Sequence, residues 1–199
     1  MGQAGMAEAA VRYLRSAGTV APVEPLPRPE LRCVREDERA PVGQTEFRRV
    51  LGNFATGVAV VTSPAADGED GPAGFACQSF SSLSLDPPLV TFMVGRTSST
   101  WPRIARAGVF CVNVLAAHQG ELCRGFAVSG TDKFAGVTFD AAPATGSPRL
   151  ADTLAWIDCT IQAVHTGGDH LIVVGRVEAL GTPGDEDRAP LLFHKGRFV

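Results

Sequence analysis

The sequence predicts a mainly β fold, a small barrel with a few short helices. Short β-branched or apolar runs such as 57–62, 89–94 and 171–180 recur along the chain, and turns rich in glycine or proline separate them. The two to four segments with helical spacing are all short. Because strands do not alternate regularly with helices, a doubly wound parallel sheet is disfavoured and a barrel is favoured.

The chain is expected to divide into an extension and one domain. Residues 1–42 contain five prolines between Pro22 and Pro41, within a charged stretch that cannot bury much apolar surface. We therefore expect residues 1–42 to be a flexible Pro-rich extension, the alternative being an arm that crosses a partner subunit. Residues 43–199 are numerous enough for one domain with its own core.

Composition narrows the functional classes. The 18 basic and 21 acidic residues give a net charge of −3 without a basic stripe, so nucleic acid is not expected as a partner. The apolar runs are too short to span a bilayer and no signal-peptide pattern is present, so no membrane association is expected. Five widely spaced cysteines indicate reduced, mostly buried thiols in a cytoplasmic protein. The four histidines lack the spacing of a metal site, so no metal is expected.

Local patterns predict the individual elements. Phe47, Val50, Leu51 and Phe54 have the spacing of one helical face, with Thr45 as the N-cap. The other expected elements are strands at 57–62, within the serine-rich segment, at 89–94 and at 108–115, short helices ending near 107 and over 117–127, and a hairpin of 154–164 and 171–180 joined by 165–170.

The segment 74–88 places four serines and a glutamine between Gly74 and a Pro-Pro stop. The simpler interpretation is an edge strand with a polar face. The functional interpretation is a surface for a flat, polar, anionic ligand, because small hydroxyls leave backbone N–H groups accessible and add donors of their own.

A second candidate lies where Arg96 precedes Ser98, Ser99 and Thr100 at an expected helix start. Hydroxyls, unpaired N–H groups and an arginine at such a position favour an anion, although a capped helix with a surface arginine explains the pattern equally well. Lys133, a cation beside an aromatic residue in a glycine-bounded loop, would by itself be a solvated charge.

Two further segments suit a nucleotide. The turn 167–170 holds His170 at a strand start, next to Asp169. Turn geometry alone explains the glycines, and the functional interpretation is a histidine at a pocket edge held by the aspartate. Near the C-terminus, 191–198 alternates aromatic rings with cations, which suits a dinucleotide or a terminal strand with a charged outer face.

Several ordered blocks together carry a family resemblance. They are 47–58, 74–80, 84–90, 113–115, 132–136, 168–170 and 190–193. In this order, over about 44–199, the chain resembles the short-chain flavin reductases of two-component flavin-dependent monooxygenases. Within that family, the Gly-Phe-Ala-Cys-Gln-Ser-Phe form is similar to the reductase components that serve actinobacterial secosteroid hydroxylases.

The resemblance implies an FMN-binding split β-barrel, usually homodimeric, that reduces FMN or FAD with NADH or NADPH. Reduced flavin would then pass to a partner monooxygenase. The residues that match the family's flavin-binding positions are Gly74, Phe75, Ala76, Cys77, Gln78, Ser79, Ser81, Ser82, Arg96, Thr97, Ser98, Ser99, Thr100, Lys133 and Phe134. Those that match its NAD(P)H-binding positions are His170, His194, Lys195, Gly196 and Arg197, with His170 as the catalytic candidate.

Two other functions stay open on the sequence. One is a flavin-binding carrier or sensor without reductase activity, and the other is a split-barrel oxidase of the pyridoxamine-phosphate type. The Gly-Asp-His turn and the cationic C-terminal block favour a protein that uses a nicotinamide nucleotide. The sequence chooses neither FMN over FAD nor NADH over NADPH, because it has no acidic ribose-binding residue in a Rossmann context. It also does not name the partner oxygenase.

Overall fold

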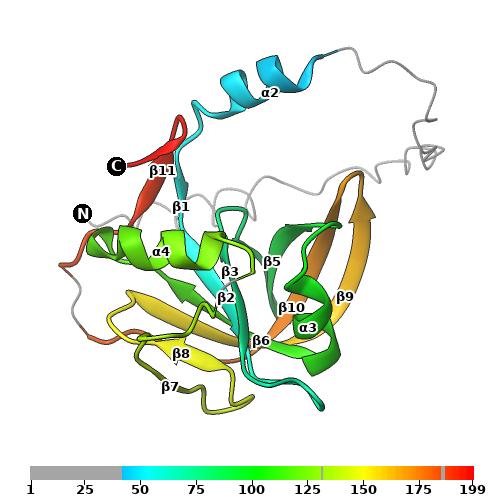
Figure 1. The fold of residues 1–199 in the computed structure, drawn as a ribbon, viewed down its shortest axis with the longest axis vertical. Helices are drawn as coiled ribbons and strands as arrows, with labels where there is room; N and C mark the ends of the chain where they lie inside the picture. The colour runs from blue at the N-terminus through cyan, green and yellow to red at the C-terminus, as the bar shows by residue number, and fades with distance from the viewer. Residues whose placement is uncertain (1–41, 131, 185–186) are drawn as a thin grey trace, which may run out of the picture. The chain divides into compact units, whose positions relative to one another are not determined.

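A computed structural model describes residues 42–130, 132–184 and 187–199 (Figure 1). The extension expected at 1–42 therefore lies, except for Val42, outside the described residues. The same holds for Cys33.

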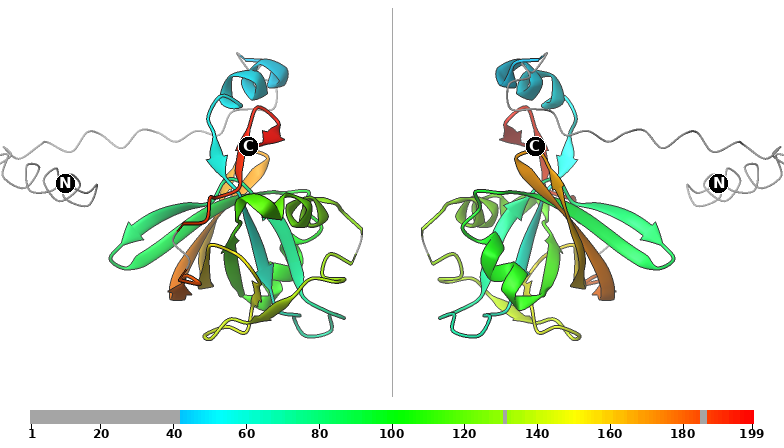
Figure 2. Two further views of the ribbon diagram at one scale, coloured as in Figure 1. Left: turned by 90° about the vertical axis from the view of Figure 1, so that its left-hand side faces the viewer. Right: turned by 90° about the vertical axis from the view of Figure 1, so that its right-hand side faces the viewer.

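The fold is built on a seven-stranded antiparallel sheet, which confirms the predicted mainly β class. The strands curl so that the first and last parts of the sheet approach each other through β3 and β5 (Figures 1 and 2). The sheet contains, in spatial order, β3 (Ala73–Cys77), β2 (Ala59–Ser63), β6 (Val109–Val114), β9 (Ala155–Gly167), β10 (His170–Gly181), β5 (Pro88–Gly95) and β4 (Ser81–Leu85).

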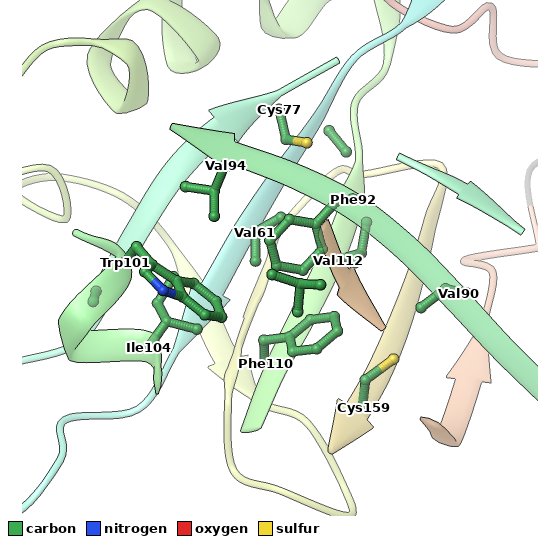
Figure 3. Packing of buried hydrophobic residues seen from close by; sticks show 13 residues of the cluster. Val61, Cys77, Val90, Phe92, Val94, Trp101, Ile104, Phe110, Val112 and Cys159 are labelled. Atoms are coloured by element: carbon green, nitrogen blue, oxygen red, sulfur yellow. The ribbon is translucent and has the colours of Figure 1, made fainter. Parts of the chain in front are cut away.

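Apolar side chains from the inner face of these strands form the core. Phe92 and Phe110 are fully buried, and their rings pack edge to face with centroids 5.2 Å apart (Figure 3). Trp101 and Ile104 cover one side of this cluster from α3 (Trp101–Ala107). The core therefore anchors α3, and with it the loop between β5 and α3.

The serine-rich segment is two strands, so the prediction of one strand there was wrong. β3 and β4 lie at opposite ends of the sheet order, and residues 78–80 cross between them. The Ser79 hydroxyl accepts a hydrogen bond from the Met93 N–H at 2.9 Å and donates one to the Met93 carbonyl at 3.0 Å. The Ser79 hydroxyl thus satisfies the backbone N–H and carbonyl of Met93 in β5, at a position before the pairing between β4 and β5 begins.

The helix predicted around residue 47 is α2 (Gln44–Leu51), with two corrections. Its N-cap is Gly43 rather than Thr45, and Phe54 lies beyond its end. The apolar face of α2 is exposed in the single chain, with 56% of Phe47, 48% of Val50 and 54% of Leu51 accessible.

The other expected short helices are present. α3 ends at Gly108, whose φ of 70° is the left-handed conformation that suits glycine. The predicted helix over 117–127 is a 3₁₀ turn, η1 (Ala117–Gln119), followed by α4 (Gly120–Ala127).

The predicted hairpin is confirmed, but its connection is shorter than expected. β9 ends at Gly167 and β10 begins at His170, so only Gly168 and Asp169 form the turn. Pairing between β9 and β10 continues into residues 165–167 and 170, which the sequence pattern had assigned to the connection.

The C-terminal block is a hairpin instead of one terminal strand. β11 (Leu192–His194) and β12 (Arg197–Phe198) are joined by Lys195 and Gly196, and β11 pairs with β1 (Thr56–Gly57). The remaining strands, β7 (Phe139–Ala141) and β8 (Pro148–Leu150), pair with each other.

Candidate functional site

A cavity of about 700 Å³ opens beside β3, within the size range of small-molecule sites. Three loops surround it: the loop between β2 and β3, the loop between β5 and α3, and the loop after α4. It brings together five of the predicted flavin-binding residues, Gly74, Ser99, Thr100, Lys133 and Phe134. The other lining residues are Asp70, Gly71, Pro72, Ala73, Arg103, Gly130, Asp132 and Phe139.

Gly74 is required at the cavity wall by packing. A Cβ at this position would lie 2.8 Å from Cε1 of Phe126 and 3.2 Å from the carbonyl oxygen of Val61. The absence of a side chain therefore lets the α4 ring pack directly on β3. The Gly74 carbonyl accepts a hydrogen bond from the Lys133 ammonium at 3.1 Å.

Lys133 is part of the wall and not a freely solvated charge. Its Nζ also donates to the Phe126 carbonyl at 3.0 Å, and this carbonyl belongs to the last turn of α4, where intrahelical partners run out. Burial lowers the pKa of the Lys133 ammonium, and the nearby charge of Arg103 lowers that pKa further. Lys133 thus ties the helix end to β3 and keeps a cation at the cavity.

Arg103 is a cavity residue that the sequence analysis missed. Its Nε donates to Oε2 of Glu69 at 2.8 Å, and its Nη2 donates to the Gly71 carbonyl at 2.7 Å. Glu69 also pairs with Arg106, and this hydrogen bond is the main cause of the lowered pKa of the Glu69 carboxyl. The spacing of Arg103 three residues after Thr100, on the same helical face, was the available signal.

The rest of the predicted ring-binding segment leads away from the cavity along β3 and onto β4. The Phe75 side chain packs against Phe92 in the core, with ring centroids 5.9 Å apart. Cys77 is buried, and burial raises the pKa of its thiol. Ala76 is half-buried, whereas Gln78, Ser81 and Ser82 are exposed.

Arg96 does not line the cavity with Ser99 and Thr100, contrary to the grouping that sequence proximity suggested. The backbone N–H of Arg96 donates to the carbonyl of Asp169 at 3.0 Å, so the backbone here lies against the β9–β10 turn. Ser98 accepts a hydrogen bond from the N–H of Trp101 at 3.2 Å and serves the start of α3.

His170 belongs to this second group. It pairs with Gly95 across β5 and β10, and a Cβ on Gly95 would contact both His170 and Thr97. Nδ1 of His170 lies 2.8 Å from Oδ1 of Asp169. This hydrogen bond is the main cause of the lowered pKa of the Asp169 carboxyl.

The predicted C-terminal nucleotide residues form a third group on the β11–β12 hairpin. His194 and Arg197 pair across it, while Lys195 and Gly196 make its turn. The Lys195 N–H donates to the Gly52 carbonyl at 3.0 Å, which attaches this hairpin to the end of α2. Tertiary structure therefore divides the predicted residues among the cavity, the β3–β4 segment that leads away from it, the β9–β10 turn and the C-terminal hairpin.

Other site types lack support in the part of the chain that the structure describes. In that part, no cluster of three or more His, Cys, Asp or Glu side chains could hold a metal ion. No helix among the described residues is long and apolar enough to cross a membrane. Four of the cysteines are free and buried: Cys77, Cys111, Cys123 and Cys159.

Comparison with known proteins defines the class. The model of the flavin reductase like domain matches residues 51–199, a range that contains the barrel and all the candidate residues. The chain therefore belongs to the flavin reductase like domain family.

Particular relatives make the relationship more specific. The reductase subunit HsaB of a flavin-dependent monooxygenase from Rhodococcus jostii is 49% identical over 154 residues, which are 77% of this chain and 75% of that protein. A solved nitrilotriacetate monooxygenase component B from Mycobacterium thermoresistibile is 45% identical, with a TM-score of 0.74 over 78% of this chain and 85% of that one. The NADH:FAD oxidoreductase SgcE6 of Streptomyces globisporus, solved with NAD and FAD fragments, is 37% identical, with a TM-score of 0.71 over 78% and 90%.

Proposed function

We propose that the protein is an NAD(P)H:flavin oxidoreductase that supplies reduced FMN or FAD to a separate monooxygenase. The observation that carries the proposal is the match to the flavin reductase like domain over residues 51–199. The relatives described above are the reductase subunit of a flavin-dependent monooxygenase, component B of a nitrilotriacetate monooxygenase and an NADH:FAD oxidoreductase.

The described residues fit a flavin. The cavity offers the half-buried cations Arg103 and Lys133 together with the hydroxyls of Ser99 and Thr100, a donor set that suits a phosphorylated chain. In the crossover after β3, Gln78 is exposed beside the half-buried Ser79, so a flat ring can approach the backbone there. A bound flavin supplies the redox chemistry, because its ring accepts a hydride from a nicotinamide.

The chain's own task is orientation and exclusion of water, which needs no acid–base pair. We propose that Gly74–Ser79 contact the ring and that Ser81 and Ser82 lie near the ribityl chain. We propose that His170 contacts the nicotinamide. Because the Asp169 carboxylate is an acceptor, it assigns the proton of His170 to Nδ1 and leaves Nε2 for the substrate side.

Steady-state kinetics test the proposal. NADH or NADPH oxidation should depend on added FMN or FAD, and the same assay without flavin is the control. Absence of flavin-dependent oxidation with either nucleotide would contradict the reductase function. Tight flavin co-purification without nucleotide oxidation would identify a carrier, and oxygen consumption with pyridoxamine phosphate would identify an oxidase.

We also propose that the protein is a homodimer. Two surfaces expose apolar side chains that a monomer seldom leaves in water. One is the apolar face of α2, and the other is the β4–β5 hairpin, which extends from the barrel (Figure 2). In this hairpin Leu85 is 94% exposed. Light scattering after size exclusion should give twice the monomer mass, whereas a monomer mass at every concentration would contradict the dimer.

A further inference from the structure

We propose that Arg103 and Lys133 together bind a phosphate group in the cavity and so set a preference for phosphorylated ligands. The inference rests on the proposed function and adds to it Arg103, a binding residue on α3. It also moves the anion site away from Arg96, which lies against the β9–β10 turn.

Not all N–H donors of the Arg103 guanidinium are used by hydrogen bonds within the described residues, so some can bind a ligand. Nε is used by Glu69, and Nη2 by the carbonyls of Gly71 and Pro72. A guanidinium has five N–H donors, and Nη1 has no hydrogen-bond partner among the described residues. The bonds at Nε and Nη2 hold the side chain in place, so a phosphate oxygen can be bound at little cost in side-chain entropy.

Lys133 leaves one donor in the same way. Two of its three N–H groups bind the carbonyls of Gly74 and Phe126. These two bonds come from opposite sides of the wall, β3 and α4, and hold the ammonium at the cavity lining. The hydroxyls of Ser99 and Thr100 line the same space and can donate to the remaining phosphate oxygens.

The charges around the cavity favour an anion inside it. Arg103 and Lys133 are half-buried, whereas the acidic lining residues Asp70 and Asp132 are exposed. Water and salt screen exposed charges more strongly than half-buried ones, so the cations dominate the potential within the cavity. Glu69 offsets part of the Arg103 charge, but it shares its carboxylate with Arg106.

Two cations that face one cavity repel each other until an anion is bound. Both side chains line the same cavity, and the charge of Arg103 contributes to the lowered pKa of the Lys133 ammonium. A phosphate between them replaces this repulsion by two charge-assisted contacts. The phosphate can belong to FMN or FAD, or to a nicotinamide dinucleotide, and the chemistry is the same in each case.

The variant Arg103→Ala shows whether the bound phosphate belongs to the flavin or to the nicotinamide dinucleotide, provided that ligand binding and turnover are measured separately. Dissociation constants for FMN, FAD and riboflavin are obtained from quenching of flavin fluorescence, which requires no reaction. Loss of Arg103 should weaken FMN binding by about tenfold or more while riboflavin, which has no phosphate, changes by less than about twofold. Arg103→Lys should lie between wild type and Arg103→Ala, because it retains the charge but loses the planar fork.

Arg106→Ala is the matched control. It removes an arginine from the same helix and the same glutamate, but Arg106 is not among the described residues that line the cavity. It should leave the ratio of riboflavin to FMN dissociation constants unchanged. Should Arg103→Ala fail to fold, the wild type still tests the site, since added salt should weaken FMN far more than riboflavin.

The outcomes are distinct. A tenfold rise in the NADH KM with unchanged FMN binding would support the phosphate site and assign it to the nucleotide. Equal weakening of FMN and riboflavin by Arg103→Ala, or no weakening of any phosphorylated ligand, would overturn the inference. Normal FMN selectivity without NAD(P)H oxidation would contradict only the proposed function, so the two can fail separately.

Discussion

The cavity wall and the β9–β10 turn hold their functional side chains in opposite ways. Lys133 and Arg103 are half-buried and each makes two or more hydrogen bonds, which tie together segments far apart in sequence. The His170 side chain is 50% exposed, and its hydrogen bond is to its chain neighbour Asp169, itself 93% exposed. A site built by packing is preorganised for one ligand group, whereas a side chain on an exposed turn can adjust as a second substrate arrives and leaves.

The largest effect on stability is expected from a substitution of Gly74 in the cavity wall. Gly74→Val would force side-chain atoms into the Phe126 ring and should reduce stability by about 1–3 kcal/mol. It should also weaken FMN binding, because β3 and α4 would have to separate. Thermal unfolding with and without FMN measures both effects. Gly125→Val, in α4 where an added Cβ has open space, is a control for a valine substitution without a clash, and valine has a slightly higher helix propensity than glycine.

A pH titration sharpens the same comparison. Phosphate binding needs the charged form of Lys133, and burial lowers the pKa of this ammonium. FMN affinity should therefore fall, by about tenfold, as the pH rises through a value below the ordinary lysine range. Riboflavin affinity should not follow this fall. Lys133→Met should remove the pH dependence, and persistence of the dependence in that variant would assign it to another group.

Ser79→Ala tests how the barrel is closed. The variant loses both hydrogen bonds to Met93, so stability should decrease by about 1–2 kcal/mol. Ser82→Ala changes an exposed hydroxyl of β4 and should alter stability by less than about 0.5 kcal/mol. Equal unfolding temperatures for the two variants would show that the Ser79 hydroxyl does not join the crossover to β5.

The smallest effect on stability is expected at the turn. His170→Ala should leave the unfolding temperature and FMN affinity nearly unchanged, because the side chain is exposed. It should raise the nucleotide KM or slow hydride transfer by about tenfold. His165→Ala changes another exposed histidine of this hairpin and is the control. An equal loss of flavin binding would contradict the nicotinamide role of His170.

Much of the local structure was predictable because it depends on neighbouring residues. Gly108 ends α3 where expected, and the long apolar runs became β5, β6, β9 and β10. Errors occurred where distant partners decided the outcome. The serine-rich segment divides at Ser79 because its hydroxyl meets Met93, 14 residues away, and nothing local distinguishes this serine from Ser81 or Ser82.

The same distinction between local and long-range determinants applies to the candidate site. The sequence alone determined which residue types were available for an anion and a nucleotide, and in what order they occur. Only tertiary structure decided that Lys133 meets the Gly74 carbonyl across 59 positions, that Arg103 meets Glu69 across 34, and that Arg96 lies elsewhere. Conformational preferences and turn chemistry act over a few neighbouring residues, but a cavity forms only when barrel closure brings separate segments into contact.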